Sequence, residues 1–187
     1  MTSQLNKIED YWNQRSFGYS LDNQEELLHD QEKWIELINR YLKINKGMKV
    51  LDLGCGPGFF SVMLTNLGCQ VIGIDYSDKM LEEARNNARK FKANVEFQKM
   101  DVQDLAFQDE IFDLIITRNV TWNLEKPVQA YQEMVRVLKK QGHLLNIDGN
   151  HYYHYQDQDY NRAGHSDHQH MEGIDVSIID NIAKELK

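Results

Sequence analysis

A turn that contains three glycines constrains the fold of this chain more than any other feature. The apolar stretch 48–53 is typical of a buried parallel strand, and Gly54, Gly56 and Gly58 follow it before the helical pattern of 59–67. Because glycine lacks a side chain, it lets the backbone turn sharply and approach a ligand closely. The sequence therefore predicts a strand, a ligand-binding turn and a helix in direct succession.

The spacing of these glycines separates the turn from two other phosphate-binding turns. A dinucleotide-binding turn has the pattern G-x-G-x-x-G, whose third glycine would fall at position 59, where the chain has Phe59. No Gly-Lys-Ser/Thr sequence follows, which excludes a P-loop. A nicotinamide-dependent oxidoreductase is therefore disfavoured, and the sequence has no hydride-transfer constellation to support one.

Strand and helix patterns alternate over residues 48–150. Strands are predicted at 48–53, 69–75, 94–101, 111–119 and 142–150, and helices at 59–67, 78–91 and 128–140. Ser77 is predicted to cap the second of these helices, and Pro127 to lie in the first turn of the third. This alternation is typical of an α/β domain, a Rossmann-like open and mainly parallel sheet with helices on both faces.

The chain of 187 residues suits a single domain, 1–187, with three parts. Residues 1–47 have a helical pattern and are expected to form an N-terminal helical cap. Residues 48–150 are expected to form the sheet core. Residues 151–187 are expected to be a polar segment followed by a C-terminal helix.

Three carboxylates follow three consecutive predicted strands. Asp52 lies near the end of the first strand, Asp75 ends the second, and Asp101 follows the third. Open α/β sheets bind ligands at the carboxyl ends of their strands, so the three side chains are expected to converge there. Asp75 can accept hydrogen bonds from both hydroxyls of a ribose, and Asp101 from the amino group of an adenine. The pattern indicates a site for a ligand that contains adenosine.

Charge and composition limit the partners of this domain. The formal net charge of −8 disfavours nucleic acid, since phosphate binding needs clustered Lys and Arg, and it favours a cationic or neutral small molecule. No stretch approaches the roughly 20 apolar residues of a membrane span, and the N-terminus lacks a signal-peptide core, so we expect a cytoplasmic protein without a membrane partner. Cys55 and Cys69 are expected to be reduced thiols.

Four motifs, in this order, resemble those of the class I methyltransferases that depend on S-adenosylmethionine (SAM). They are Asp52-x-Gly54-x-Gly56-x-Gly58, Gly73-Ile74-Asp75, Met100-Asp101-Val102 and Phe112-Asp113-Leu114-Ile115. The resemblance covers residues 45–150 and is closest to the methyltransferase type 11 group of small-molecule enzymes. It implies an enzyme that transfers a methyl group from SAM to a small-molecule acceptor and leaves S-adenosyl-L-homocysteine (SAH).

The resemblance also assigns cofactor contacts to residues at the ends of the first four strands. The residues expected at the cofactor are Asp52, Gly54, Cys55, Gly56, Gly58, Asp75, Tyr76, Met80, Asp101, Val102, Arg118 and Asn119. Asp52 would face the methionine moiety, Asp75 would hold the ribose, and Arg118 and Asn119 would line the floor beneath the sulfonium. Met80, expected to flank adenine, is explained equally well as a core residue of its helix.

The acceptor and the catalytic residue are not identified by the resemblance. If the acceptor needs a general base, the candidates are His151, Tyr152 and His154, for which a plain surface position is the simpler explanation. Enzymes that methylate nucleobase amines usually carry Asn/Asp-Pro-Pro-Tyr after the fourth strand, whereas this chain has Arg-Asn-Val-Thr at 118–121, which disfavours that substrate class. The histidines of 165–170 lack the spacing of a strong metal site, so no metal is predicted.

Two features leave alternatives open. Tyr11, Trp12 and Tyr19 resemble the aromatic cover that related enzymes fold over the cofactor, although packing against the sheet explains them equally. Enzymes of this family usually end in two further strands. The chain is therefore expected to be truncated, to belong to a minimal branch of the family, or to pair its open sheet edge with another chain, as in a homo-oligomer. A non-catalytic SAM-binding module, or an incomplete domain that needs a partner chain, is the alternative function.

Overall fold

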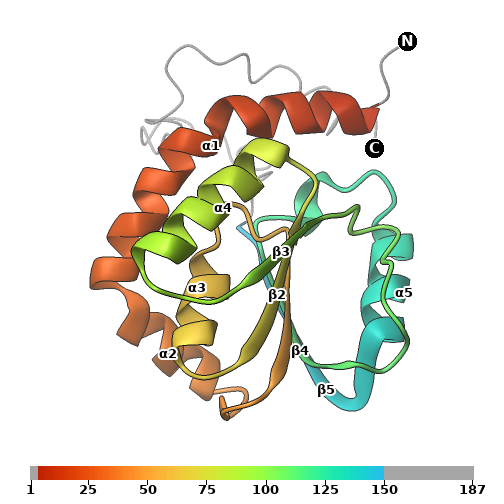
Figure 1. Cartoon of the computed structure of the whole chain (residues 1–187). Coiled ribbons are helices and arrows are strands. Elements are labelled where there is room, and N and C mark those ends of the chain that lie inside the picture. The colour runs from red at the N-terminus through yellow and green to blue at the C-terminus, as the bar shows by residue number, and fades with distance from the viewer. Residues whose placement is uncertain (1–3, 150–187) are drawn as a thin grey trace, which may run out of the picture.

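A single parallel sheet forms the centre of the molecule (Figure 1). The structure is a computed structural model that describes residues 4–149. The strands are β1 (Lys49–Leu53), β2 (Gln70–Asp75), β3 (Glu96–Lys99), β4 (Phe112–Arg118) and β5 (Leu138–Ile147). Their order is β3-β2-β1-β4-β5, and each described pair is parallel. The predicted Rossmann-like open sheet is thereby confirmed.

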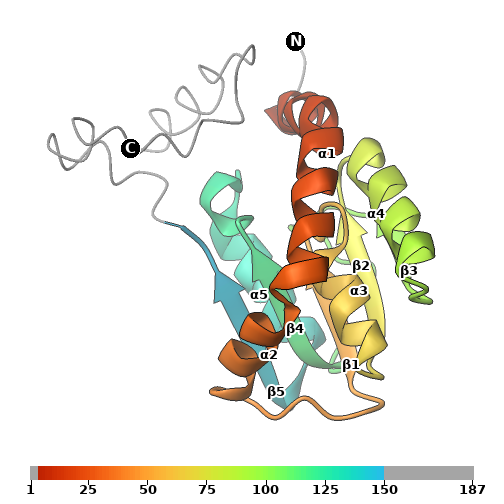
Figure 2. The same cartoon turned by 90° about the vertical axis from the view of Figure 1, so that its left-hand side faces the viewer.

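Helices cover both faces of this sheet, as predicted. They are α1 (Gln4–His29), α2 (Gln31–Asn39), α3 (Phe59–Asn66), α4 (Asp78–Lys90) and α5 (Pro127–Val137), with a short 3₁₀ turn, η1 (Thr121–Asn123). The helices α1 to α4 lie on one side of the sheet and α5 on the other (Figures 1 and 2). The N-terminal helices form the expected cap, because α1 packs along α4 and α3.

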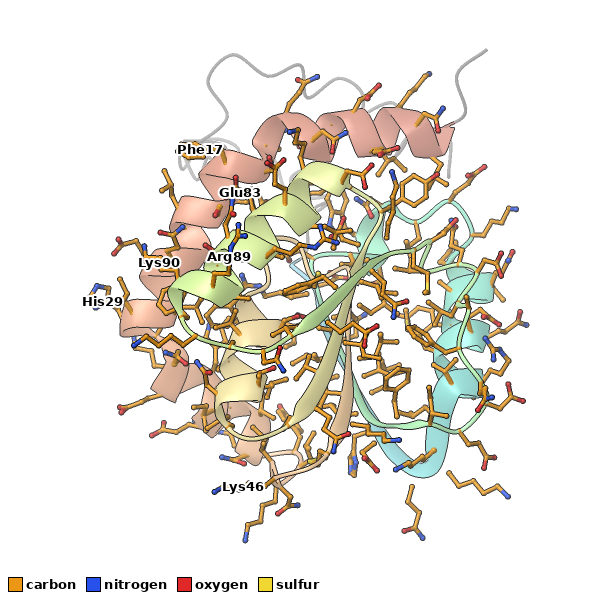
Figure 3. The ribbon with its side chains drawn as sticks, in the orientation of Figure 1. Phe17, His29, Lys46, Glu83, Arg89 and Lys90 are labelled. Carbon is orange, nitrogen blue, oxygen red and sulfur yellow. The ribbon has the colours of Figure 1, made fainter. Side chains whose placement is uncertain are left out.

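Two apolar clusters fill the spaces between the sheet and the helices, where Figure 3 shows the side chains as sticks. The cluster under α1, α2 and α3 includes Leu27, Ile38, Phe60, Val71 and Leu114, and the cluster under α5 includes Leu51, Leu53, Ile115, Met134 and Val137. Neighbouring residues of a strand point to opposite faces, so both faces of the central strands are buried. This explains why these strands read as continuous apolar runs in the sequence.

Two residues that the sequence assigned to helix starts take the expected positions, and a third residue joins three strands. The Met80 amide donates to Ser77 Oγ at 3.0 Å, so Ser77 caps α4. Pro127 lies in the first turn of α5. The carboxylate of Asp113 accepts hydrogen bonds from the Lys49 amide at 2.9 Å and from Lys139 Nζ at 2.7 Å. Asp113 thus joins β1, β4 and β5 and lies at the start of its strand.

The junction between α5 and β5 differs from the prediction. The sequence predicts a helix over 128–140 and a strand over 142–150, whereas α5 ends at Val137 and β5 begins at Leu138. Leu138 pairs with Phe112 of β4, and this pairing with a neighbouring strand overrides the good intrinsic helix propensity of the residues after Val137. In the same way β3 is shorter than predicted, and covers Glu96–Lys99 instead of 94–101.

Some predictions concern residues 150–187 and lie outside the described part of the chain. They include the end of the fifth strand, the C-terminal helix, the histidines of 165–170 and the candidate bases His151, Tyr152 and His154. The organisation of 1–187 as one domain also stays a prediction. Within residues 4–149, no helix is both long enough and apolar enough to cross a membrane.

Candidate functional site

A cavity lies at the carboxyl ends of the strands, next to α1. It holds about 1020 Å³ of space when the volume open to solvent is included. We call the residues at the ends of β1 to β4 the cavity floor: Asp52, Gly54, Cys55, Gly56, Pro57, Phe59, Phe60, Asp75, Tyr76, Met80, Asp101, Val102, Gln103 and Arg118. The cavity roof is Leu5, Ile8, Trp12, Tyr19 and Asn23 of α1, and the side loop is Asn119, Val120, Asn123, Leu124 and Glu125.

The structure brings together the residues that the sequence predicted at the cofactor, with one exception. All of them line the cavity except Gly58. Gly58 has a φ of +86° and precedes α3, where a Cβ atom would lie 3.3 Å from Ala84 Cβ and 3.3 Å from Phe97 Cζ. Its lack of a side chain therefore serves the packing of α3 against α4 and β3, not the cavity wall.

Gly54 and Gly56 shape the cavity in different ways. Gly54 has a φ of +65°, and a Cβ atom there would lie only 2.3 Å from Val120 Cγ2, so this glycine lets the side loop approach β1. Gly56 has a φ of +51°, and a Cβ atom there would meet no protein atom within 4 Å. Because Gly56 lines the cavity, its missing side chain leaves room for a ligand.

The backbone amides of the glycine turn are already engaged within the protein. The Cys55 amide donates to the Ile74 carbonyl at 2.8 Å, and the Gly58 amide donates to the Cys55 carbonyl at 2.9 Å. The Gly56 amide donates to Asp75 Oδ2, also at 2.9 Å. A pyrophosphate would need such donors to be free, so this arrangement argues against a dinucleotide at the turn.

Asp75 is the central acceptor of the cavity floor. Besides the Gly56 amide, its carboxylate accepts the Ser77 amide at 2.8 Å through Oδ1. A carboxylate has about four acceptor positions, so about two remain for hydroxyl donors of a ligand. Burial raises the pKa of Asp75, while the amides of Ser77, Gly56 and Tyr76 act in the opposite direction.

Asp52 is a buried carboxylate beneath the same cavity. Its side chain is 3% exposed, and Ser61 Oγ of α3 donates to its Oδ2 at 2.6 Å. Burial raises the pKa of Asp52 to about 6, although the Ser61 hydrogen bonds and the charge of Arg118 act to lower it. Asp52 therefore changes its charge close to neutral pH.

Asp101 is fixed by a residue that the sequence did not predict. The amide of Gln103 donates to Asp101 Oδ1 at 2.9 Å, and Gln103 Nε2 donates to the same oxygen at 3.2 Å. Gln103 is buried, lines the cavity, and also accepts the Lys126 amide at the start of α5. The role of Gln103 depends on contacts with Lys126 and Gln129, which are distant in sequence, so no local motif indicates it.

Arg118 is the last residue of β4 and Asn119 follows it, and each has a clear structural role. Arg118 forms a two-pronged ion pair with Glu26 of α1. Asn119 has a φ of +57°, and its amide donates to the Ile147 carbonyl at 2.9 Å. The Asp148 carboxylate then accepts the next amide, that of Val120, at 2.9 Å and holds the side loop next to β5.

The cavity roof is one face of α1. Leu5, Ile8, Trp12, Tyr19 and Asn23 are spaced three, four or seven residues apart, so they share one side of the helix. A cover over the cofactor is one of the two explanations that the sequence leaves open for Trp12 and Tyr19, and nothing in the sequence singles out Leu5, Ile8 and Asn23. Their helical spacing shows that they share a face with Trp12 and Tyr19, but not that this face meets the cavity.

The aromatic residues near the N-terminus have separate roles. Trp12 and Tyr19 line the cavity, and their rings meet edge to face at 5.5 Å between centroids. Tyr11 is buried beside Arg15, whose guanidinium carbon lies 3.8 Å from the ring centroid. Burial raises the pKa of Tyr11 to about 12. Tyr11 is therefore buried, whereas Trp12 and Tyr19 lie at the cavity, and their role as a cover over the cofactor stays a prediction.

Carboxylates dominate the charge of this cavity. The described wall carries Asp52, Asp75, Asp101 and Glu125, against one cationic side chain, Arg118. Within residues 4–149, no three side chains of His, Cys, Asp or Glu come together as a metal site. The cavity is thus suited to a ligand that has hydroxyl donors and a positive charge.

The chain is similar to curated methyltransferases over part of their length. A ubiquinone biosynthesis O-methyltransferase of Coxiella burnetii is 30% identical over 100 residues, which cover 54% of this chain and 43% of the relative. A demethylmenaquinone methyltransferase of Listeria welshimeri is 32% identical over 120 residues, which cover 62% and 51%. The chain therefore spans about half the length of the curated relatives that it matches.

A solved structure and a protein family extend this similarity. The crystal structure of a SAM-dependent methyltransferase from Mesorhizobium loti has a TM-score of 0.55 and 26% identity, and the match covers 64% of this chain and 54% of that one. The sequence also matches a family described as a methyltransferase domain over residues 44–183. These findings confirm the resemblance that the four motifs indicated. Because the family match spans well over half of the sequence, the chain belongs to the methyltransferase domain family.

Proposed function

We propose that this chain binds SAM in the cavity and transfers its methyl group to a small-molecule acceptor. The observation that carries the proposal is the Asp75 carboxylate, which two backbone amides hold at a cavity whose described wall has four carboxylates and one guanidinium. SAM combines two ribose hydroxyls with a positively charged sulfur. The carboxylates of the cavity wall can accept hydrogen bonds from the hydroxyls and attract the positive charge.

The residues of the cavity floor fit this cofactor. Asp75 keeps acceptor positions for the ribose hydroxyls, and Gly56 leaves the adjoining space without a side chain. Tyr76, Met80 and Val102 supply apolar surface to the same cavity, which suits an adenine ring. The expectation that Met80 is a core residue also holds, because its side chain is 3% exposed.

When bound, SAM supplies a methyl group that is already activated on a positively charged sulfur. The chain then has two tasks, which are to orient the cofactor and acceptor and to exclude water. Orientation contributes roughly 7–11 kcal/mol in well-aligned intramolecular reactions. The floor carboxylates orient the cofactor, and Trp12 and Tyr19 of the roof shield the cavity from water. A general base is required only where the pKa of the acceptor demands one.

The small-molecule class of the acceptor is supported by the names of the curated relatives. They are named for ubiquinone biosynthesis and for demethylmenaquinone, and both names denote small-molecule chemistry. The roof residues Leu5 and Ile8 and the side-loop residue Leu124 add apolar surface to the cavity, which suits an acceptor with an apolar part.

Two measurements on the full chain test this proposal. Calorimetric titration with SAM, SAH and NADH is expected to give saturable binding of SAM and SAH and none of NADH. Incubation of SAM with a panel of phenols, amines and thiols is expected to yield SAH with at least one acceptor. Tight NADH binding without SAM binding would overturn the proposal. Saturable SAM binding without any product would replace it with the non-catalytic binding module.

A further inference from the structure

The guanidinium of Arg118 is the one cationic group in the described wall of the cavity, and a partner from α1 engages it. Arg118 Nη1 lies 3.0 Å from Glu26 Oε1, and Nη2 lies 2.8 Å from Glu26 Oε2. This geometry, with two parallel hydrogen bonds, is the strongest form of an arginine–carboxylate pair. Both side chains are mostly buried, at 21% and 28% exposure.

Aromatic rings hold the same guanidinium from other directions. Its central carbon lies 5.1 Å from the ring centroids of Trp34 and Phe59 and 5.5 Å from that of Phe60. The carboxylate and these three rings therefore fix Arg118 at the end of β4. The site contains this cation permanently, since the guanidinium does not lose its proton at any physiological pH.

A fixed positive charge at this place opposes the binding of a cationic ligand. Arg118 lines the cavity together with Asp52, and its charge reaches far enough to lower the pKa of that carboxyl group. Without a counter-charge, the guanidinium would repel a sulfonium and attract anions into the cavity. Glu26 cancels this charge but does not itself line the cavity.

We propose that Glu26 is a specificity-determining positioning residue, which neutralises Arg118 so that the cavity favours the positively charged SAM over its neutral product SAH. This inference rests on the proposed function, because it assumes that the ligand is SAM. SAM and SAH share adenosine, ammonium and carboxylate groups and differ at the sulfur, which carries a methyl group and a positive charge only in SAM. The ratio of their affinities therefore reports the electrostatic environment of the sulfur.

A purely structural role for the ion pair predicts a different result. The pair joins α1 to β4 over 92 residues of sequence, so its loss would loosen the cavity roof. A loosened roof would weaken SAM and SAH alike, because both molecules occupy the same space. Only an electrostatic role separates the two ligands.

The test is calorimetric titration of SAM and SAH at low ionic strength into the full chain and three variants. Glu26→Gln leaves Arg118 without its counter-charge and is expected to lower the SAM-to-SAH affinity ratio about fivefold. Glu25→Gln is the matched control and is expected to leave the ratio unchanged. Glu25 is 72% exposed and pairs with His29, which projects away from the sheet in Figure 3.

Arg118→Gln tests the same inference by changing the other member of the ion pair. It removes the guanidinium and leaves the charge of Glu26, so the SAM-to-SAH ratio is expected to rise about fivefold. This variant keeps the inference testable if Glu26→Gln does not fold, which circular dichroism would reveal. Equal losses of both ligands, or an unchanged ratio, in the variants that fold would overturn the inference. Wild-type chain that binds neither ligand would instead overturn the proposed function.

Discussion

The floor and the roof of the cavity are held in place by different kinds of contact. On the floor, several of the fixing hydrogen bonds join residues close in sequence, such as Asp75 to Ser77 and Ser61 to Asp52, and the Gly56 amide reaches Asp75 over only 19 residues. The roof depends on contacts between distant segments. Glu26 pairs with a residue 92 positions away, and Lys99 Nζ lies 2.6 Å from the carboxylate of Glu9, 90 positions away.

Because of this difference, the floor and the roof are expected to affect different properties of the cavity. The floor is built into the turns that follow the strands, so it keeps its shape wherever the sheet forms. The roof is attached through side chains of α1, and its position follows from several separate surface contacts. We therefore expect substitutions on the floor to decide whether the cofactor binds, and substitutions on the roof to change how well the cavity is closed.

The largest expected effect contrasts a floor glycine with an exposed glycine of α1, the helix that carries the roof. Gly54→Ala combines a left-handed backbone with a clash against Val120, and is expected to lower the free energy of unfolding by about 3 kcal/mol. Gly18→Ala is the control. Gly18 is exposed within α1 and a Cβ atom there meets nothing within 4 Å, so this change should add about 0.5–1 kcal/mol. Urea unfolding measures both, and the same sign for the two variants would contradict the contrast.

The floor is tested directly at Asp75. Asp75→Asn removes the negative charge and one oxygen acceptor and is expected to weaken SAM about 50-fold, corresponding to about 2–3 kcal/mol. Asp78→Asn, three residues later, is the matched control, because this carboxylate is 68% exposed and pairs with Lys99. Calorimetry gives both affinities. Full SAM affinity in Asp75→Asn would place the ribose elsewhere.

The pH dependence of binding should follow Asp52. Its pKa of about 6 means that the side chain is neutral below this pH and negatively charged above it. SAM affinity is therefore expected to rise about tenfold between pH 5 and pH 7, since a carboxylate attracts a cation and a carboxylic acid does not. In Asp52→Asn the affinity should be flat over this range. A wild-type profile as flat as that of the variant would contradict the role of Asp52.

The same group should affect the stability of the free protein in the opposite direction. Burial raises the pKa of Asp52 from 3.8 to about 6, so the folded chain binds this proton more tightly than the unfolded chain does. Folding is therefore expected to lose stability as the pH rises from about 4 to about 6, by up to about 3 kcal/mol from this group. Urea unfolding at several pH values measures the change, and Asp52→Asn serves as the reference.

The smallest expected effect concerns the roof. Trp12→Ala removes one aromatic ring from the cavity and is expected to weaken SAM about three- to fivefold, the scale of a partly exposed cation–π contact. Phe17→Ala is the control on the same helix, because Phe17 is 66% exposed and points outward in Figure 3. It should leave SAM affinity unchanged. A loss at Trp12 as large as that at Asp75 would remove the distinction between floor and roof.

The same distinction explains how much of the site the sequence revealed. The glycine turn and the carboxylates after β1, β2 and β3 are local motifs, and local motifs can be read without knowledge of the fold. Gly58 shows where a local motif misleads. Its spacing matches that of the cavity glycines, but its missing side chain serves the packing of α3. Leu5, Ile8 and Asn23 were missed because their role depends on where α1 docks.

The boundaries of the elements show the same dependence on distant contacts. Ser77 and Pro127 were assigned correctly, because capping depends on a few neighbouring residues. The start of β5 at Leu138 was predicted wrongly, because it is set by pairing with Phe112. The Arg118–Glu26 pair could likewise not be predicted from the sequence, since no spacing rule links a residue of α1 to a residue of β4.

The long separation between Glu26 and Arg118 has a consequence for how the chain folds. Contacts between distant segments form slowly, because a long loop must close before they form. The cap helix is made before β4 during synthesis, so the carboxylate of Glu26 has no partner until Arg118, 92 residues later, has been made and brought to it. Until then the cavity lacks its final charge balance. Tight SAM binding by a refolding chain would therefore report the completion of folding, and its kinetics should lag behind the formation of helical structure.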